Sequence, residues 1–192
     1  RDESIILSEI SEKLGVNPNI ELEDEKVISW VRKWQAVDKM CLFLNAEAAD
    51  CWEAINDGEM VISRTRRVKN IIDCSGRHLA SPRLGDGGLS LTHQGAKWLH
   101  SLRIIETPTE FISEPLELHI GKGPAWVVIT DDAVPFVIEG KNVFHGFVLA
   151  CDPWLRPSQA CIIVDKNGLL IAHGISKATP QEMAEFRKGI AV

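Results

Sequence analysis

The chain has 192 residues, of which 45% are hydrophobic and 25% charged, and its formal net charge is −6. This length suits one sizeable core or two small ones, because domains usually run to about 100–150 residues. The net charge excludes a nucleic-acid binder that is basic over its whole surface, but it allows one with a local basic patch. No apolar run approaches the roughly 20 residues that span a bilayer, and the amino end is acidic and polar. We therefore expect a cytoplasmic protein without a membrane partner.

The first part of the chain predicts an acidic extension followed by helices. In the extension, residues 1–25, apolar side chains repeat at helical spacing from Ser4 to Leu14. Helical spacing returns over residues 27–40, and residues 46–55 suit a further helix. These helices open an α+β domain that we place at residues 26–104.

The rest of that domain predicts a small antiparallel sheet over residues 60–92, because short alternating apolar runs are separated by turn signals. Thr92 follows as the N-cap of a short helix. Three prolines and two glycines mark residues 105–124 as a linker. Beyond it, two short helices interrupt a set of strands, expected at residues 126–129, 143–150, 160–164 and 169–172. This pattern predicts a compact barrel that closes to remove open sheet edges.

Basic residues are concentrated in one segment, which is the first indication of function. Residues 61–104 hold 8 basic and 2 acidic side chains, a net of +6, whereas residues 1–60 carry −8 and residues 105–192 carry −4. A cationic face on an anionic chain suits a phosphate-bearing partner, because binding releases counterions. The other interpretation is a solvated sheet edge, where Lys and Arg discourage edge-to-edge pairing. The charges alone leave both interpretations open.

The last third of the chain carries an ordered set of short motifs. They are Asp132-Ala133-Val134-Pro135, Gly140-Lys141-Asn142, Asp152-Pro153-Trp154-Leu155-Arg156-Pro157, Lys166-Asn167-Gly168, Ala172-His173-Gly174 and Arg187-Lys188-Gly189. In this order they resemble the PUA domain, a small RNA-binding pseudo-barrel, which we assign to residues 125–192. The predicted fold class is therefore α+β, a small helix-plus-antiparallel-sheet domain followed by a PUA-type β pseudo-barrel. Within it, Asn167-Gly168 suits a two-residue turn that needs positive φ.

The preceding segment resembles the domain that comes before the PUA unit in archaeal tRNA-guanine transglycosylase and in its relative archaeosine synthase. The residues that carry this resemblance are Val61-Ile62-Ser63-Arg64-Thr65-Arg66-Arg67, Leu79-Ala80-Ser81-Pro82-Arg83 and Leu91-Thr92-His93-Gln94-Gly95-Ala96. Both resemblances together imply that the chain binds tRNA on its acceptor-stem side. They do not extend to the chemistry, because the chain lacks the paired-aspartate segment, the cysteine cluster for structural zinc and the Pro-Cys-x-x-Lys-Pro-Tyr signature of those enzymes.

The resemblance also implies which residues contact the RNA. Arginine forks hold phosphate oxygens bidentately, and duplex RNA is recognised mainly through shape, phosphates and 2′-hydroxyls. The candidates in the basic segment are Arg64, Arg66, Arg67 and Lys69, and those of the PUA unit are Gly140, Lys141, Phe144, Lys177, Arg187 and Lys188.

Two of these candidates have a second interpretation. Gly140 either leaves main-chain N–H groups free for a phosphate or simply caps a helix. Phe144 either stacks on an exposed base or is buried in the barrel. The six histidines are scattered and the five cysteines form no CxxC pair, so we expect no metal, no cofactor and no catalytic residue.

Our leading hypothesis is a tRNA-binding, non-catalytic chain that supports tRNA guanine exchange or archaeosine modification. It would act with a separate catalytic transglycosylase or archaeosine synthase subunit. The alternative is a protein-interaction module with PUA architecture that no longer contacts RNA, which the net negative charge favours. An enzyme with its own pocket has the least support, because the motifs supply no nucleophile, base or metal site.

Overall fold

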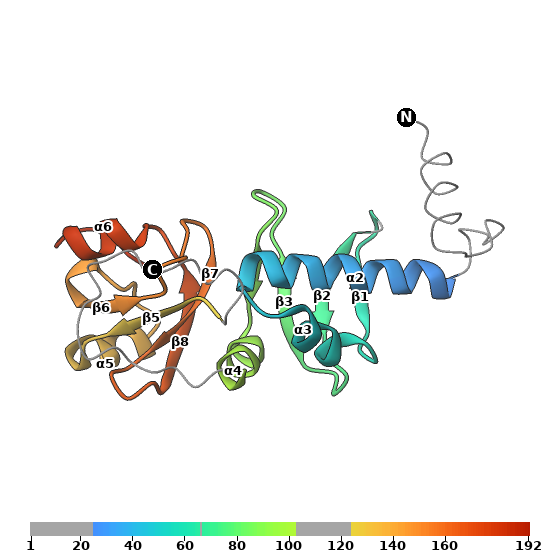
Figure 1. The fold of residues 1–192 in the computed structure, drawn as a ribbon, viewed down its shortest axis with the longest axis horizontal. Coiled ribbons are helices and arrows are strands. Elements are labelled where there is room, and N and C mark those ends of the chain that lie inside the picture. The colour runs from blue at the N-terminus through green and yellow to red at the C-terminus, as the bar shows by residue number, and fades with distance from the viewer. Residues whose placement is uncertain (1–24, 66, 103–123) are drawn as a thin grey trace. The chain divides into compact units, whose positions relative to one another are not determined.

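The computed structural model describes residues 25–65, 67–102 and 124–192, without the side chains of residues 25 and 26 (Figure 1). The helical stripe predicted from Ser4 to Leu14 and nearly all of the predicted linker lie outside these residues. The chain divides into two compact units, Arg1–Arg32 and Lys33–Val192. The second unit holds every element described below except the start of the first helix.

The first domain of this unit combines helices with an antiparallel sheet, as predicted. Helices α2 (Glu25–Leu44) and α3 (Ala48–Ile55) come first. The sheet that follows has four strands, and each strand pairs with the next one along the chain. They are β1 (Met60–Ile62), β2 (Val68–Ile72), β3 (His78–Pro82) and β4 (Leu89–Leu91). From Lys33 onward α2 buries Val37, Met40 and Leu44, and the Trp34 ring stacks on the Trp52 ring of α3 with centroids 4.6 Å apart.

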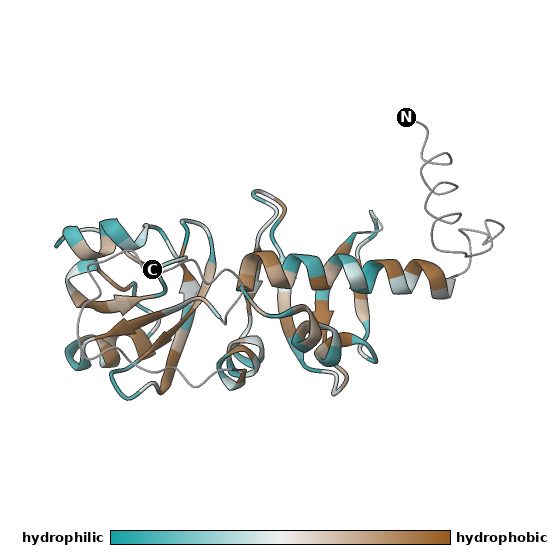
Figure 2. Cartoon of the chain, in the orientation of Figure 1, coloured by the Kyte–Doolittle hydropathy of each residue, from teal (hydrophilic) through white to brown (hydrophobic). Residues whose placement is uncertain are grey.

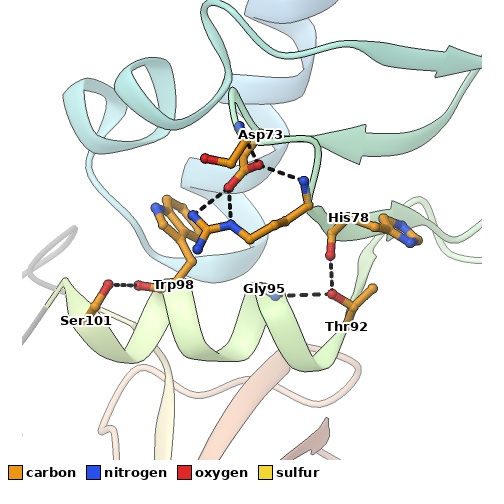
Figure 3. A network of polar contacts seen from close by, with 8 residues as sticks. Asp73, His78, Thr92, Gly95, Trp98 and Ser101 are labelled. Carbon is orange, nitrogen blue, oxygen red and sulfur yellow. Dashed lines mark hydrogen bonds and ion pairs between the residues drawn. The ribbon is translucent and has the colours of Figure 1, made fainter.

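Helix α4 (His93–Ser101) closes the first domain, and its predicted cap is confirmed. The Thr92 hydroxyl oxygen accepts a hydrogen bond from the Gly95 N–H at 3.1 Å (Figure 3). The same hydroxyl donates to the His78 carbonyl and so ties the helix to β3. A Cβ on Gly95 would lie 1.8 Å from the Leu79 carbonyl oxygen, so only glycine allows α4 to pack backbone to backbone on β3.

The second domain is built on a mixed sheet with the order β6-β5-β7-β8. Its strands are β5 (Trp126–Ile129), β6 (Val148–Cys151), β7 (Ala160–Val164) and β8 (Leu170–Ile175). Strand β5 is parallel to β7, and the other pairs are antiparallel. Helices α5 (Val134–Ile138) and α6 (Pro180–Glu185) flank it, and an isolated antiparallel bridge joins Phe144 to Ile190. The α+β fold class predicted from the sequence is therefore confirmed, with a helix-plus-sheet domain followed by a PUA-type β fold.

The connection between β7 and β8 differs in detail from the two-residue turn that we predicted. The Asp165 N–H donates to the Leu169 carbonyl, and the Gly168 N–H donates to the Asp165 carbonyl, so residues 166–168 form a three-residue loop. Gly168 has a φ of 77°, which is the positive φ that the Asn-Gly signal indicates. The Asp165 carboxylate accepts the Leu169 N–H, which fixes the loop and which the turn signal alone does not specify.

Strands β5 and β7 are buried along their whole length, and their side chains alternate between two cores. The side chains of Trp126, Val128 and Ile162 belong to a core that also contains Met40, Leu79 and Leu99 of the first domain. Their neighbours Val127, Ile129, Cys161 and Ile163 belong to a second core within the PUA domain. Figure 2 shows the resulting hydrophobic colour along β5. Since successive side chains of a strand point to opposite faces, one sheet forms a wall of both cores.

Asp73 holds the turn between β2 and β3 (Figure 3). Its carboxylate accepts hydrogen bonds from the N–H groups of Ser75 at 2.9 Å and Arg77 at 2.8 Å, and from the Arg77 Nε at 2.7 Å. Burial of this carboxyl raises its pKa, but the hydrogen bonds from Arg77 and Ser75 outweigh burial, so the pKa of Asp73 lies below its usual range. The charged carboxylate therefore stabilises the folded state.

We predict that Ile162→Ala destabilises both domains together. Ile162 is fully buried in the shared core, and truncating such a side chain costs roughly 2–5 kcal/mol of unfolding free energy. Denaturant unfolding followed by tryptophan fluorescence and by far-UV circular dichroism should shift equally in both signals. Leu169→Ala, at an exposed leucine, serves as the control and should change stability by no more than about 0.5 kcal/mol. Two separated transitions would contradict the shared core.

We also predict that Asp73→Asn lowers the unfolding free energy at pH 7 by about 1–2 kcal/mol, because it removes charge-assisted hydrogen bonds. Because the folded pKa of Asp73 is depressed, its contribution is present above the ordinary aspartate pKa and is lost as the pH falls through the folded value. The difference between wild type and variant should therefore close as the pH falls from the ordinary aspartate range through the lower folded pKa of Asp73. Asp131→Asn, which breaks an exposed ion pair with Lys166, should show little difference at any pH.

Candidate nucleic-acid interface

The basic segment, residues 61–104, contains both paired and unpaired cations. Arg77 forms an ion pair with Asp73 at 2.7 Å, and Arg83 forms one with Asp86 at 2.8 Å. By contrast, the exposed side chains Arg64, Arg67 and Lys69 form no ion pair within the described part of the chain. The predicted contact Arg66 lies outside the described residues. The positive charge available to a partner is therefore concentrated near the connection between β1 and β2.

The geometry of this connection bears on the interpretation of the basic segment as a protected sheet edge. The Ser63 N–H donates to the Arg67 carbonyl at 2.8 Å, and the Ser63 hydroxyl oxygen accepts the Arg67 N–H at 3.2 Å, so the hairpin connection is closed. The edge strand β1 itself, Met60-Val61-Ile62, carries no charge. The cations lie beyond the edge strand or on β2, so they do not protect the sheet edge. Their position therefore does not support the edge-protection interpretation.

Gly140 belongs to an ordinary helix cap, which is one of the two interpretations given above. The Gly140 N–H donates to the Val137 carbonyl at 2.9 Å, and the Lys141 N–H donates to the Phe136 carbonyl at 3.1 Å. These two bonds and a φ of 82° at Gly140 form a Schellman motif. Both N–H groups are used inside the cap, so the interpretation of free main-chain donors for a phosphate is wrong. The motif instead fixes the direction in which Lys141 leaves the helix.

Phe144 is not buried in the barrel, because 46% of its surface is exposed. Its backbone pairs with Ile190 in an isolated antiparallel bridge, and the next residue, His145, donates its N–H to the Gly189 carbonyl. The carboxy-terminal segment thereby lies beside the Lys141–Phe144 loop. Lys177 joins the same region, because its N–H donates to the Ala191 carbonyl at 2.8 Å.

Five of the six PUA candidates are exposed and lie in segments that these backbone contacts join, whereas the sixth, Gly140, is used in the helix cap. They are the exposed residues Lys141, Phe144, Lys177, Arg187 and Lys188, which we call the PUA face. Lys141 pairs with Glu139 at 2.9 Å, but both side chains are more than half exposed, at 60% and 64%. Such a pair is weak and exchanges readily for another anion.

Sequence reasoning missed several exposed apolar residues of this domain, one of which contacts a PUA-face cation. The Lys141 ammonium lies 5.3 Å from the centroid of the half-exposed Phe136 ring. Ile138, Phe186 and Ile190 are also exposed. Helix α5 has only five residues, which is too short for apolar periodicity to show which side faces solvent. No signal in the sequence would have identified this set.

His145 packs against the carboxy-terminal segment that carries part of the PUA face. It is buried, and its ring meets the Phe186 ring edge-on with centroids 5.7 Å apart. A Cβ on Gly189 would lie 3.3 Å from the His145 ring, and Gly189 has a φ of 102°. Glycine at position 189 thus allows the carboxy-terminal segment to cross close over the imidazole.

Three observations on the described residues concern metal binding, thiol reactivity and membrane spans. No group of three or more His, Cys, Asp and Glu side chains among them is placed to hold a metal ion. Burial raises the pKa of the Cys151 and Cys161 thiols to about 12, so both are protonated and poor nucleophiles. None of the helices in the described ranges combines the length and the apolarity that crossing a membrane requires.

Two family assignments match this architecture. Residues 43–104 match the patch-forming domain C2 of tRNA-guanine transglycosylase, and residues 125–192 match the PUA domain. The chain therefore carries both domains, and the resemblance given by its motifs is confirmed.

Relatives with curated names support the same assignment over the carboxy-terminal 73% of the chain. The chain is 35% identical over 140 residues to a tRNA-guanine(15) transglycosylase of Thermococcus onnurineus and 36% identical over 143 residues to one of Pyrococcus furiosus. In both cases the match covers 73% of this chain and 21% of the relative, so the chain spans about a fifth of the length of these enzymes. A hypothetical protein of Pyrococcus horikoshii OT3 has a similar fold, with a TM-score of 0.56 and 15% identity over 84% of this chain and 87% of that one.

Proposed function

We propose that this chain, which carries the patch-forming domain C2 and the PUA domain of tRNA-guanine transglycosylases, is a tRNA-binding chain without catalytic residues of its own. PUA domains bind RNA, and the relatives are named for their action on tRNA guanine. The observation that carries the proposal is the PUA face, where exposed cations and exposed aromatic rings occur together. Cations bind phosphates, and aromatic rings stack on bases, so a nucleic acid uses both.

The hairpin cations Arg64, Arg67 and Lys69 would supply a second set of phosphate contacts. Arginine suits this role because its planar fork can hold two phosphate oxygens at once. A duplex is the expected form of RNA at this set, because duplex RNA is recognised mainly through phosphates and 2′-hydroxyls, and these three side chains offer no ring on which a base could stack. We propose the acceptor-stem side of tRNA as the bound region, with the PUA face nearest the stem end.

The proposed role in the cell is to support tRNA guanine exchange or archaeosine modification. Because no group of described residues is placed to hold a metal ion and the Cys151 and Cys161 thiols are poor nucleophiles, we assign the chemistry to a separate catalytic transglycosylase or archaeosine synthase chain. This chain would hold the tRNA for it. The competing proposal is a protein-interaction module that has lost RNA contact, and it predicts a different response to ribonuclease.

We predict that tRNA affinity falls steeply with salt and that single cation removals flatten this dependence. The affinity of wild type, Arg67→Ala and Lys188→Ala for a tRNA transcript should be measured by fluorescence anisotropy across a series of KCl concentrations. Each variant should bind more weakly and should lower the slope of log K against log salt by about 1, because one phosphate contact is lost. Lys97→Ala is the matched control, since Lys97 is an exposed lysine on α4 outside both sets, and it should leave the slope unchanged. Salt-independent binding, or none, would contradict the proposal.

We further predict that this chain increases guanine exchange by a catalytic chain that lacks its own RNA-binding domains. Exchange of labelled guanine into tRNA should rise when wild type is added and should rise less with Arg67→Ala. Recovery of the partner by affinity capture should survive ribonuclease if the contact is a direct protein interaction, and should be lost if tRNA bridges the two chains. Capture without any tRNA binding would favour the competing proposal.

A further inference from the structure

Leu84 has the largest exposed fraction, 82%, of the large apolar side chains in the described residues. It lies in the connection between β3 and β4, residues 83–88, where a polar residue would be better solvated. Neither the hydrophobic core nor the contacts of the PUA face account for a leucine at this position.

The connection that carries Leu84 is held rigidly by its neighbours. Arg83 binds the Asp86 carboxylate with two parallel bonds, Nε to Oδ1 at 2.9 Å and Nη2 to Oδ2 at 2.8 Å. The Arg83 N–H donates to the Gly88 carbonyl at 2.7 Å, and the Lys39 ammonium donates to the Gly87 carbonyl at 3.1 Å. A side chain presented by so fixed a turn loses little conformational entropy on binding.

The position of this turn relates it to both sets of cations. In a sheet with the order β1-β2-β3-β4, the β1–β2 and β3–β4 connections lie at the same end, and Figure 1 shows both at the upper end of the sheet. Strand β4 contacts β7 and β8, so the β3–β4 connection is on the side of the sheet next to the PUA domain. The Arg83 guanidinium also donates a hydrogen bond to the carbonyl of Ser158, which belongs to the PUA domain.

Backbone hydrogen bonds of Ser158 connect this turn to a residue next to the PUA face. Its N–H donates to the Ser176 carbonyl at 2.8 Å, and the residue after Ser176 is Lys177 of the PUA face. The exposed Arg156 lies in the same PUA loop. The only carboxylate in the turn, Asp86, is neutralised by Arg83. Leu84 thus lies in a turn at the same end of the sheet as the exposed cations Arg64 and Arg67, and this turn is bonded to the PUA loop that carries the exposed Arg156.

From this placement we infer that Leu84 is an RNA contact, in which its side chain packs against ribose in the shallow minor groove of the bound tRNA while the cations on either side hold the phosphates. This inference rests on the proposed function and adds a residue to it. The minor groove of A-form RNA is wide and shallow, so a projecting side chain can reach its sugars. An apolar side chain contributes there by removing carbon surface from water rather than by displacing counterions.

The distinguishing experiment is the effect of Leu84→Ala on affinity and on salt dependence at the same time. Anisotropy titrations with a tRNA transcript should show a loss of about five- to tenfold in affinity, as expected for part of a buried leucine side chain. The slope against salt should stay at the wild-type value, because no phosphate contact is removed. Leu84→Met keeps an apolar side chain of similar volume and should bind nearly as well as wild type.

Leu169→Ala is the matched control, since Leu169 is another exposed leucine beside a tight turn, at the β7–β8 connection. It should leave tRNA affinity unchanged. If wild type binds tRNA with the expected salt dependence but Leu84→Ala binds equally well, this inference is overturned and the proposed function stands. A change in slope for Leu84→Ala also overturns it, since the turn would then act through its charges. Absence of tRNA binding by wild type overturns the proposed function itself.

Discussion

The complete burial of β5 and β7 is the constraint on which the rest of this structure depends. Every side chain of these two strands is buried, and alternate positions face different cores. Strands buried on both faces cannot separate from either layer without exposing apolar surface. The two domains predicted from the sequence are therefore one packed body from Lys33 onward. The prolines and glycines of residues 105–124 suggested instead a linker between separate domains.

Polar contacts between the domains follow from this packing and fix the loops at its margin. The Arg156 guanidinium donates to the Leu42 carbonyl at 2.9 Å, and His100 Nε2 lies 2.7 Å from the Gly168 carbonyl oxygen. Each contact joins a side chain of one domain to a main-chain carbonyl of the other. Such bonds satisfy carbonyl groups that the domain contact would otherwise remove from water. They also set where the loops that carry exposed cations stand with respect to one another.

The features that the sequence predicted well are those decided by neighbouring residues. Thr92 is followed by Gly95 at the spacing that a side-chain cap requires, and the helix cap at Gly140 is one of the two interpretations that the sequence left open. Both depend only on the local backbone. The ion pairs of Asp73 with Arg77 and of Asp86 with Arg83 also lie at short spacing in turns. Counting charges over residues 61–104 overlooked them, and it therefore overstated the number of cations that a partner could use.

Phe144 shows why the rest of the site could not be predicted. Its exposure depends on which side of the isolated bridge to Ile190 faces the solvent. The two bridged residues are 46 positions apart in the sequence. A single bridge has no alternating pattern, so period-2 reasoning gives no answer for it. The frequent burial of phenylalanine favours the core, whereas the return of the carboxy-terminal segment places this ring outside it.

The contrast between paired and unpaired cations also explains how a chain of net charge −6 can suit RNA. Electrostatic attraction at a surface is governed by charges within about a Debye length, roughly 8 Å at physiological salt, rather than by the total. Arg77 and Arg83 are used within their own turns, while Arg64, Arg67 and Lys188 have no partner among the described residues. An acidic protein would satisfy these cations, and it would also have to present apolar side chains to cover Phe144 and Phe186. A nucleic acid offers phosphates to the cations and flat apolar bases to the rings, so it accounts for both features with one partner.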